Sequence, residues 1–181
     1  LLIPTKKRST ACVSSQVGCS LDCTFCATAS MKRMRNLNAD EIYDQVVSIN
    51  QQSLIYHQRP LSNIVFMGMG EPLMNYKNVL ASIDKITDPK GLGMSPKRIT
   101  LSTSGIPKII RKMADDGVRF CLAVSLHSAR QELREQIMPF ATKFPLDELL
   151  KSLKHLYACT KKQITFESVS YTHLTLPTSS R

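Results

Sequence analysis

Residues 64–86 read IVFMGMGEPLMNYKNVLASIDKI and contain one complete strand–turn–helix unit. Ile64–Met67 is a continuous apolar run, which is typical of a strand buried on both faces of a parallel sheet. After a glycine-containing turn, Asn75 begins a segment with apolar residues at helical spacing, namely Val79, Leu80, Ile83 and Ile86. Because a strand followed directly by a helix is the repeating unit of α/β proteins, this stretch predicts that fold class.

The same unit recurs on both sides of this stretch. The predicted strands are residues 12–13, 64–67, 99–101, 120–126 and 164–169. The predicted helices begin near Asn38, Asn75, Pro107 and Asp147, and a short one lies around Leu133 and Ile137. The last of them places on one stripe Leu146, Leu149, Leu150, Leu153, Leu156 and Tyr157. Five parallel strands with helical crossovers fit a partial (β/α) barrel or an open doubly wound sheet, and in both the chemistry lies at the strands' carboxyl ends.

The composition indicates one basic domain without membrane spans. A chain of 181 residues with 43% hydrophobic content can bury one sizeable core. Its net charge of +10 favours a polyanionic partner such as nucleic acid, although dispersed basic clusters also suit a solvated surface. Since no apolar run is long enough to cross a membrane, we expect no membrane association and a cytoplasmic location.

The two ends of the chain differ from its centre. The chain begins at Leu1 and a strand-like segment follows at once, so we expect a fragment of a longer protein. Residues 1–169 are expected to form an incomplete core domain. Residues 170–181 are rich in Ser and Thr and lack a helical period, so we expect an irregular tail that resembles a translated cloning adaptor. An ordinary disordered terminus is the alternative.

Three cysteines form the most specific chemical motif in the chain. Cys19, Cys23 and Cys26 are spaced Cys-x3-Cys-x2-Cys in a polar loop after the first strand. Thiolates are the usual ligands of iron–sulfur clusters, and three of them leave one iron of a 4Fe-4S cluster open for a small molecule. A tetrahedral zinc site would need a fourth nearby Cys or His, which the loop lacks. A disulfide framework does not suit a chain of this size with cytosolic features.

Four stretches of sequence resemble one known enzyme family. The motif Cys-x3-Cys-x-Phe-Cys is similar to that of the radical S-adenosylmethionine (SAM) superfamily, in which the open iron binds SAM. The longer stretches resemble the RlmN family of dual-specificity RNA methyltransferases: CVSSQVGC at 12–19, GMGEPL at 68–73, ITLSTSG at 99–105 and SLHS at 125–128. The resemblance implies a partial (β/α) barrel of the radical SAM type, truncated at both ends.

The resemblance also implies two cofactors, a 4Fe-4S cluster on the three cysteines and SAM beside it. The expected cofactor contacts are Phe25, Gly70, Glu71, Ser102, Ser125, Leu126 and His127. From the residues alone, Gly68 and Gly70 do not begin a dinucleotide fingerprint, because the third glycine position holds Leu73. Two glycines there let a ligand approach the backbone, and the Glu71 carboxylate can accept hydrogen bonds from an ammonium group. A tight turn with Glu71 as a helix-start charge is the alternative.

Cys12 matches a second functional cysteine of the family. In the family this thiol helps to release the methylated RNA, so the resemblance implies a catalytic role for Cys12. A buried thiol in the first strand is equally consistent with the sequence alone.

The resemblance implies an enzyme that methylates C2 of adenine in 23S rRNA and tRNA and uses two SAM molecules. It further implies an electron donor such as flavodoxin or ferredoxin. Neither Cys121 nor Cys159 matches the motif of the family's methyl-carrying cysteine, so we expect this polypeptide alone to be inactive. Two alternatives stay open, a Cfr-type enzyme that methylates adenine at C8 and a non-catalytic, zinc-bearing nucleic-acid-binding module.

Overall fold

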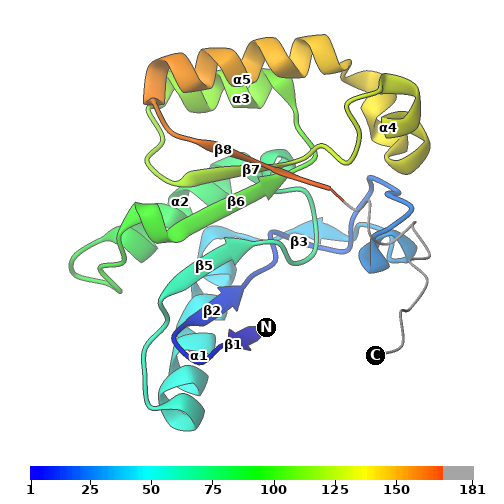
Figure 1. Cartoon of the computed structure of the whole chain (residues 1–181). Coiled ribbons are helices and arrows are strands. Elements are labelled where there is room, and N and C mark those ends of the chain that lie inside the picture. The colour runs from blue at the N-terminus through cyan, green and yellow to red at the C-terminus, as the bar shows by residue number, and fades with distance from the viewer. Residues whose placement is uncertain (169–181) are drawn as a thin grey trace, which may run out of the picture.

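The chain folds around one mostly parallel sheet (Figure 1). The computed structural model describes residues 1–168, so the predicted tail at 170–181 lies outside the described residues. The sheet has six strands in the order β1-β2-β5-β6-β7-β8, in which only the β1–β2 pair is antiparallel. These strands are β1 Leu2–Pro4, β2 Ser9–Cys12, β5 Asn63–Phe66, β6 Ile99–Thr103, β7 Cys121–Ser125 and β8 Ile164–Glu167. The five predicted parallel strands are thus present, although the first is Ser9–Cys12 rather than residues 12–13, and β1 adds an antiparallel edge.

Helices connect the parallel strands, as the sequence predicted. They are α1 Ala39–His57, α2 Tyr76–Thr87, α3 Pro107–Asp115, α4 Gln131–Ile137 and α5 Leu146–Thr160. The short 3-10 helices are η1 Ala27–Ser30, η2 Pro72–Asn75, η3 Pro96–Arg98 and η4 Pro139–Lys143. The predicted capping box is present, because the Asn38 side chain accepts from the Glu41 N–H while the Glu41 carboxylate accepts from the Asn38 N–H. A small antiparallel ribbon joins β3 Gln16–Val17 to β4 Arg35–Asn36.

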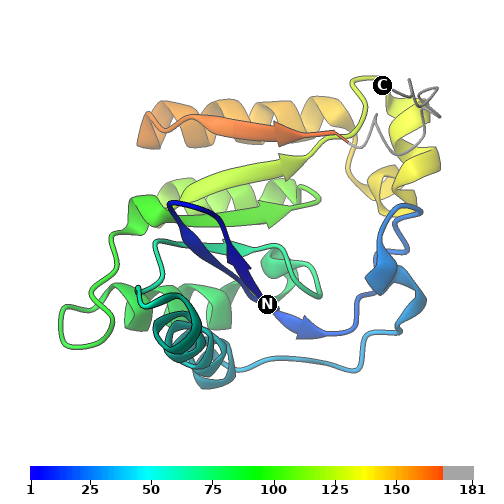
Figure 2. The same cartoon turned by 60° about the horizontal axis from the view of Figure 1, so that its bottom comes forward.

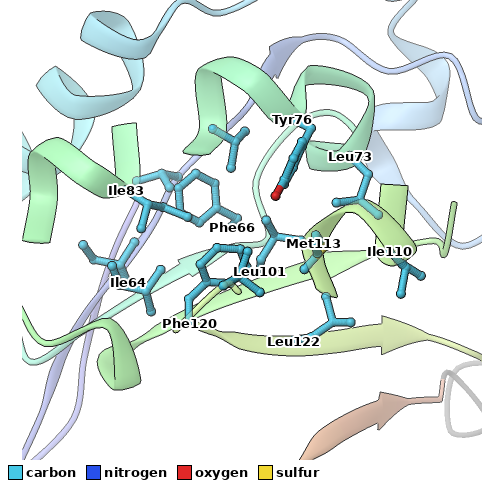
Figure 3. Close-up of a cluster of buried hydrophobic side chains, with 14 of the residues drawn as sticks. Ile64, Phe66, Leu73, Tyr76, Ile83, Leu101, Ile110, Met113, Phe120 and Leu122 are labelled. Carbon is cyan, nitrogen blue, oxygen red and sulfur yellow. The ribbon is translucent and has the colours of Figure 1, made fainter. Parts of the chain in front are cut away.

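The two faces of the sheet carry different residues. Ile64, Phe66 and Leu101 point to the face that α2 and α3 cover, where they are buried with Ile110 and Met113 (Figure 3). Burying such side chains contributes about 1.5–3 kcal/mol each, and this layer holds the helices on the sheet. The opposite face carries half-buried small and polar residues that the strand register aligns, among them Cys12, Val65, Thr100, Ser102, Ser125 and Glu167. This second face is the inner wall of a barrel that the described residues do not close.

The apolar stripe predicted on α5 is only partly buried. Leu149, Leu153 and Leu156 of α5 are buried, but Leu150 and Tyr157 on the same predicted stripe are 48% and 51% exposed. They border a hollow against β8, which is an edge strand of the sheet. No described element packs over that edge, so the wide apolar stripe of α5 is only half covered.

Tyr76 ties α2 to the end of α3 and allows a test of the packing. Its hydroxyl donates to the Asp116 carboxylate at 2.8 Å, and this hydrogen bond, with one from Lys112, lowers the pKa of Asp116. A carboxyl with a lowered folded-state pKa adds stability that is present above its ordinary pKa and lost as the pH falls through the folded value. Tyr76→Phe should therefore cost about 1 kcal/mol at neutral pH and reduce the loss of stability below about pH 4.

Urea unfolding between neutral and acid pH measures both effects. Tyr157→Phe is the matched control, because Tyr157 is an exposed tyrosine on α5. An acid dependence of Tyr76→Phe equal to that of the wild type would contradict the role given to this hydrogen bond.

Within residues 1–168, none of the helices has the length and apolar character needed to cross a membrane.

Candidate functional site

A cavity lies where the carboxyl ends of β5–β8 meet the cysteine loop. Its volume is about 400 Å³, within the usual size of small-molecule sites. Both views of the chain place the loop that follows β3 beside α4 at these strand ends (Figures 1 and 2). Nine predicted site residues line this one cavity: Cys19, Cys23, Phe25, Cys26, Gly70, Glu71, Ser102, Ser125 and His127. The fold therefore brings together residues that are more than a hundred positions apart in sequence.

Backbone contacts fix the cysteine loop at both ends. The Cys19 N–H donates to the Met31 carbonyl at 3.1 Å, and Gly18 has a φ of +74° that allows this close return of the chain. At the other end, the N–H and hydroxyl of Thr24 both donate to the Ile137 carbonyl, at 3.0 and 3.2 Å. Helix α4 thus carries one side of the loop that holds the cysteines.

The thiols of this loop are free and partly desolvated. Burial raises the pKa of Cys19, and it raises the pKa of Cys23 to about 12, with further increases from repulsion by Cys19 and Cys26. Cys19 and Cys23 therefore keep their protons at neutral pH unless a metal displaces them. In the described part of the chain, no three Cys, His, Asp or Glu side chains are arranged to hold a single metal ion. Three free thiols spread around one cavity fit a multi-iron cluster, in which each thiolate binds a different iron.

The Glu71 carboxylate is buried and fully hydrogen-bonded. Its Oε1 accepts from the Leu73 N–H at 3.0 Å and the Thr103 hydroxyl at 2.5 Å. Its Oε2 accepts from the N–H and the hydroxyl of Ser104, both at 2.8 Å. Burial raises the pKa of Glu71, and these four donors oppose that rise. Since a carboxylate has about four acceptor positions, a ligand ammonium would have to displace a hydroxyl donor.

The glycines before Glu71 let the chain after β2 pack closely against this turn. A Cβ on Gly70, whose φ is +94°, would lie 2.5 Å from the Gln16 Cβ, and one on Gly68 would lie 2.7 Å from the Val13 carbonyl oxygen. The Gln16 side chain in turn accepts from the Glu71 N–H at 3.0 Å. Both glycines also line the cavity, so the close approach of a ligand to their backbone stays a prediction.

Ser102 and Ser125 share a partner that the sequence analysis missed. Their hydroxyls donate to the same oxygen of Glu167, at 2.8 and 3.0 Å, and Glu167 also lines the cavity. Glu167 ends β8 in register with Ser125. The available signal was the alternation of β8, which places Glu167 on the inner face of the sheet two residues after Thr165.

The two aromatic residues predicted at the site touch each other. The rings of Phe25 and His127 lie 4.2 Å apart between centroids in an edge-on arrangement. Burial lowers the pKa of His127, and neither of its ring nitrogens has a hydrogen-bond partner among the described residues. His127 also has a φ of +58°, which the pairing of its N–H with the Glu167 carbonyl holds in place.

Two predicted residues lie outside the cavity. Leu126 lines a separate hollow beside α5, and its N–H donates to the Val124 and Glu167 carbonyls. Cys12 lies at the end of β2 on the inner face of the sheet, the face that also carries Ser102. Neither side chain lines the cavity that the three cysteines share.

The chain is similar to known proteins of one superfamily. Residues 13–178 match the radical SAM superfamily. The chain is 68% identical over 169 residues to a protein of Christiangramia forsetii and 44% identical to one of Thermus thermophilus, covering 93% and 91% of this chain. Both are named probable dual-specificity RNA methyltransferase RlmN, and the chain spans about half of their length, 48% and 46%.

A solved structure leads to the same family. The crystal structure of a radical SAM methyltransferase from Sphaerobacter thermophilus matches 92% of this chain and 49% of its own, with a TM-score of 0.88 and 38% identity. The chain therefore belongs to the radical SAM superfamily and, within it, groups with the RlmN methyltransferases.

Proposed function

We propose that this chain is the cofactor-binding core of a SAM-dependent RNA methyltransferase that modifies C2 of adenine in 23S rRNA and tRNA. Cys19, Cys23 and Cys26 would hold a 4Fe-4S cluster, and the cavity between them and Glu71 would take SAM. The observation that carries this proposal is the convergence of three free thiols and the strand-end residues on one cavity. The names of the relatives support RNA as the substrate class. Those relatives are about twice as long as this chain.

The chain's own residues would bind and orient SAM while the cluster supplies the electron for its reductive cleavage. Glu71 would accept from the methionine ammonium once a Thr103 or Ser104 hydroxyl turns away. Phe25 and His127 would close one wall of the site and limit the access of water. We keep a catalytic role for Cys12 and a SAM contact for Leu126 as predictions, to be tested by substitution.

The serine pair indicates which part of SAM it would face. A hydroxyl has one donor, and both serines spend theirs on Glu167, so only their acceptor positions remain for a ligand. Acceptors suit the ribose hydroxyls, which are donors, and do not suit the SAM carboxylate. Glu167 would then accept from the ribose together with Ser102 and Ser125.

Glu167→Gln should weaken SAM binding about tenfold, or about 1.4 kcal/mol, because the amide loses one acceptor and its charge. Calorimetric titration of the anaerobically reconstituted chain with SAM measures the change. Glu132→Gln is the control, since Glu132 is exposed on α4. Equal affinities of Glu167→Gln and wild type would exclude Glu167 from the SAM site.

The RNA partner would be held by basic residues beside the cysteine loop. Lys32 and Arg33 are exposed between η1 and β4, whereas Arg35 is engaged by the Glu41 carboxylate at 2.7 Å. Basic side chains next to a reactive site hold phosphates and position the base. An electron donor such as flavodoxin or ferredoxin would deliver the reducing electron to the cluster.

A chimaera tests the proposed activity as a whole. Residues 1–168 of this chain would replace the matching half of the Christiangramia forsetii relative, and RNA from cells lacking their own enzyme would be digested and analysed by mass spectrometry. We expect 2-methyladenosine in rRNA and tRNA. Formation of 8-methyladenosine instead would favour the Cfr-type alternative, and absence of both from a well-folded chimaera would contradict the proposal.

A further inference from the structure

Arg134 is a buried charged side chain that the proposed SAM site does not use. It lies on α4, the short helix whose last residue, Ile137, accepts the hydrogen bonds of Thr24 in the cysteine loop. Only 1% of Arg134 is exposed. The residue is thus enclosed between α4, the cysteine loop and the turn after β6 that contains Ser104.

Most of the hydrogen-bonding capacity of Arg134 is unused. Its Nη2 donates to the Ser104 carbonyl at 2.6 Å, while Nε and Nη1 have no partner among the described residues. A guanidinium keeps its charge in proteins and carries five N–H donors. A buried cation without an anion and with unpaired N–H donors is costly, and a negative group beside it would remove that cost.

The surroundings indicate which negative group this is. None of the ion pairs within residues 1–168 includes Arg134. Cys23 directly precedes Thr24, whose N–H and hydroxyl donate to the Ile137 carbonyl at the end of α4, so the loop segment fixed to this helix carries one of the proposed cluster ligands. Arg134 does not line the cavity proposed for SAM.

We propose that Arg134 donates its free N–H groups to the Cys23 thiolate and the adjoining sulfide of the cluster, and thereby raises the cluster's reduction potential. This inference rests on the proposed binding of a 4Fe-4S cluster by the loop. Reduction adds one negative charge to the cluster, and a buried positive charge with N–H···S hydrogen bonds stabilises the reduced form more than the oxidised one. Arg134 would be a positioning residue that acts through the cluster, since it does not reach the proposed substrate site.

Redox titration of the reconstituted chain, followed by electron paramagnetic resonance, tests this inference. Arg134→Gln should lower the equilibrium constant for reduction about tenfold, which corresponds to a midpoint about 59 mV lower for one electron. Arg134→Lys keeps the charge and should stay closer to the wild type. Arg130→Gln is the control, because Arg130 is exposed at the start of the same helix. A fully loaded Arg134→Gln protein with the wild-type midpoint would overturn the proposal.

Loading itself gives a second readout if the glutamine variant does not assemble a cluster. In that case the proposal requires that positive charge supports assembly, so Arg134→Lys should load iron. If the lysine variant also fails to load iron, only the shape of the side chain matters, and the proposal is overturned. Failure of the wild-type chain to load iron is a different result. It would contradict the proposed function and not the role of Arg134 alone.

Discussion

Replacing Cys23 with alanine should abolish assembly of the 4Fe-4S cluster. Cys23 is the middle cysteine of the motif, and burial raises its pKa to about 12. A 4Fe-4S cluster with three protein thiolates already has one iron without a protein ligand. Loss of one thiolate would leave two such irons. Iron and sulfide per chain, after anaerobic reconstitution, should fall from about four each to background, together with the broad visible absorbance.

The other cysteines provide matched controls for this prediction. Cys121 and Cys159 lie outside the cavity, near the Lys97 carbonyl and the His155 ring respectively, and their alanine variants should load like the wild type. Cys12→Ala should also load normally, which would separate its predicted catalytic role from cluster binding. Full loading of Cys23→Ala would refute the assignment, and a colourless wild type that holds one zinc per chain would favour the nucleic-acid-binding module.

Much of the fold was predictable because apolar residues recur at regular strand and helix spacing along the chain. Parallel strands buried on one face and helices with apolar stripes alternate along the chain, and the capping box at Asn38 marks the start of α1 in sequence and structure alike. The ribbon of β3 and β4 was missed, since a pair of two-residue strands carries no measurable alternation. The exposure of Leu150 depends on what lies beyond β8, and helical spacing contains no information about that.

The residues of the candidate site were predictable where they lie in a recognisable sequence motif. The cysteine spacing and the family stretches identified nine residues that line one cavity, but only the folded chain shows that Gln16 packs against Gly70. Glu167 and Arg134 were missed. Each is a single charged residue in an ordinary strand or helix, and its significance comes from partners 65 and 30 positions away.

Gly18→Ala should disrupt the cysteine loop almost as severely as loss of a ligand. A Cβ at this position would overlap the Lys32 carbonyl oxygen and lie 2.8 Å from its carbon. The neighbouring backbone cannot yield freely, because the Met31 carbonyl accepts from the Cys19 N–H and the Met34 N–H donates to the Val17 carbonyl. The overlap and the φ of +74° together should cost about 2–5 kcal/mol, and the loop can relieve that cost only by moving Cys19.

Gly117→Ala separates the overlap from the backbone conformation. Gly117 has a similar φ of +61° after α3, but a Cβ there would meet no atom within 4 Å. The control should lose only about 1 kcal/mol in urea unfolding and load a full cluster, whereas Gly18→Ala should lose more stability and most of its iron. Equal iron content in the two variants would mean that the turn at Gly18 does not position Cys19. The loop would then owe its ligand geometry to its other support, the hydrogen bonds between Thr24 and the end of α4.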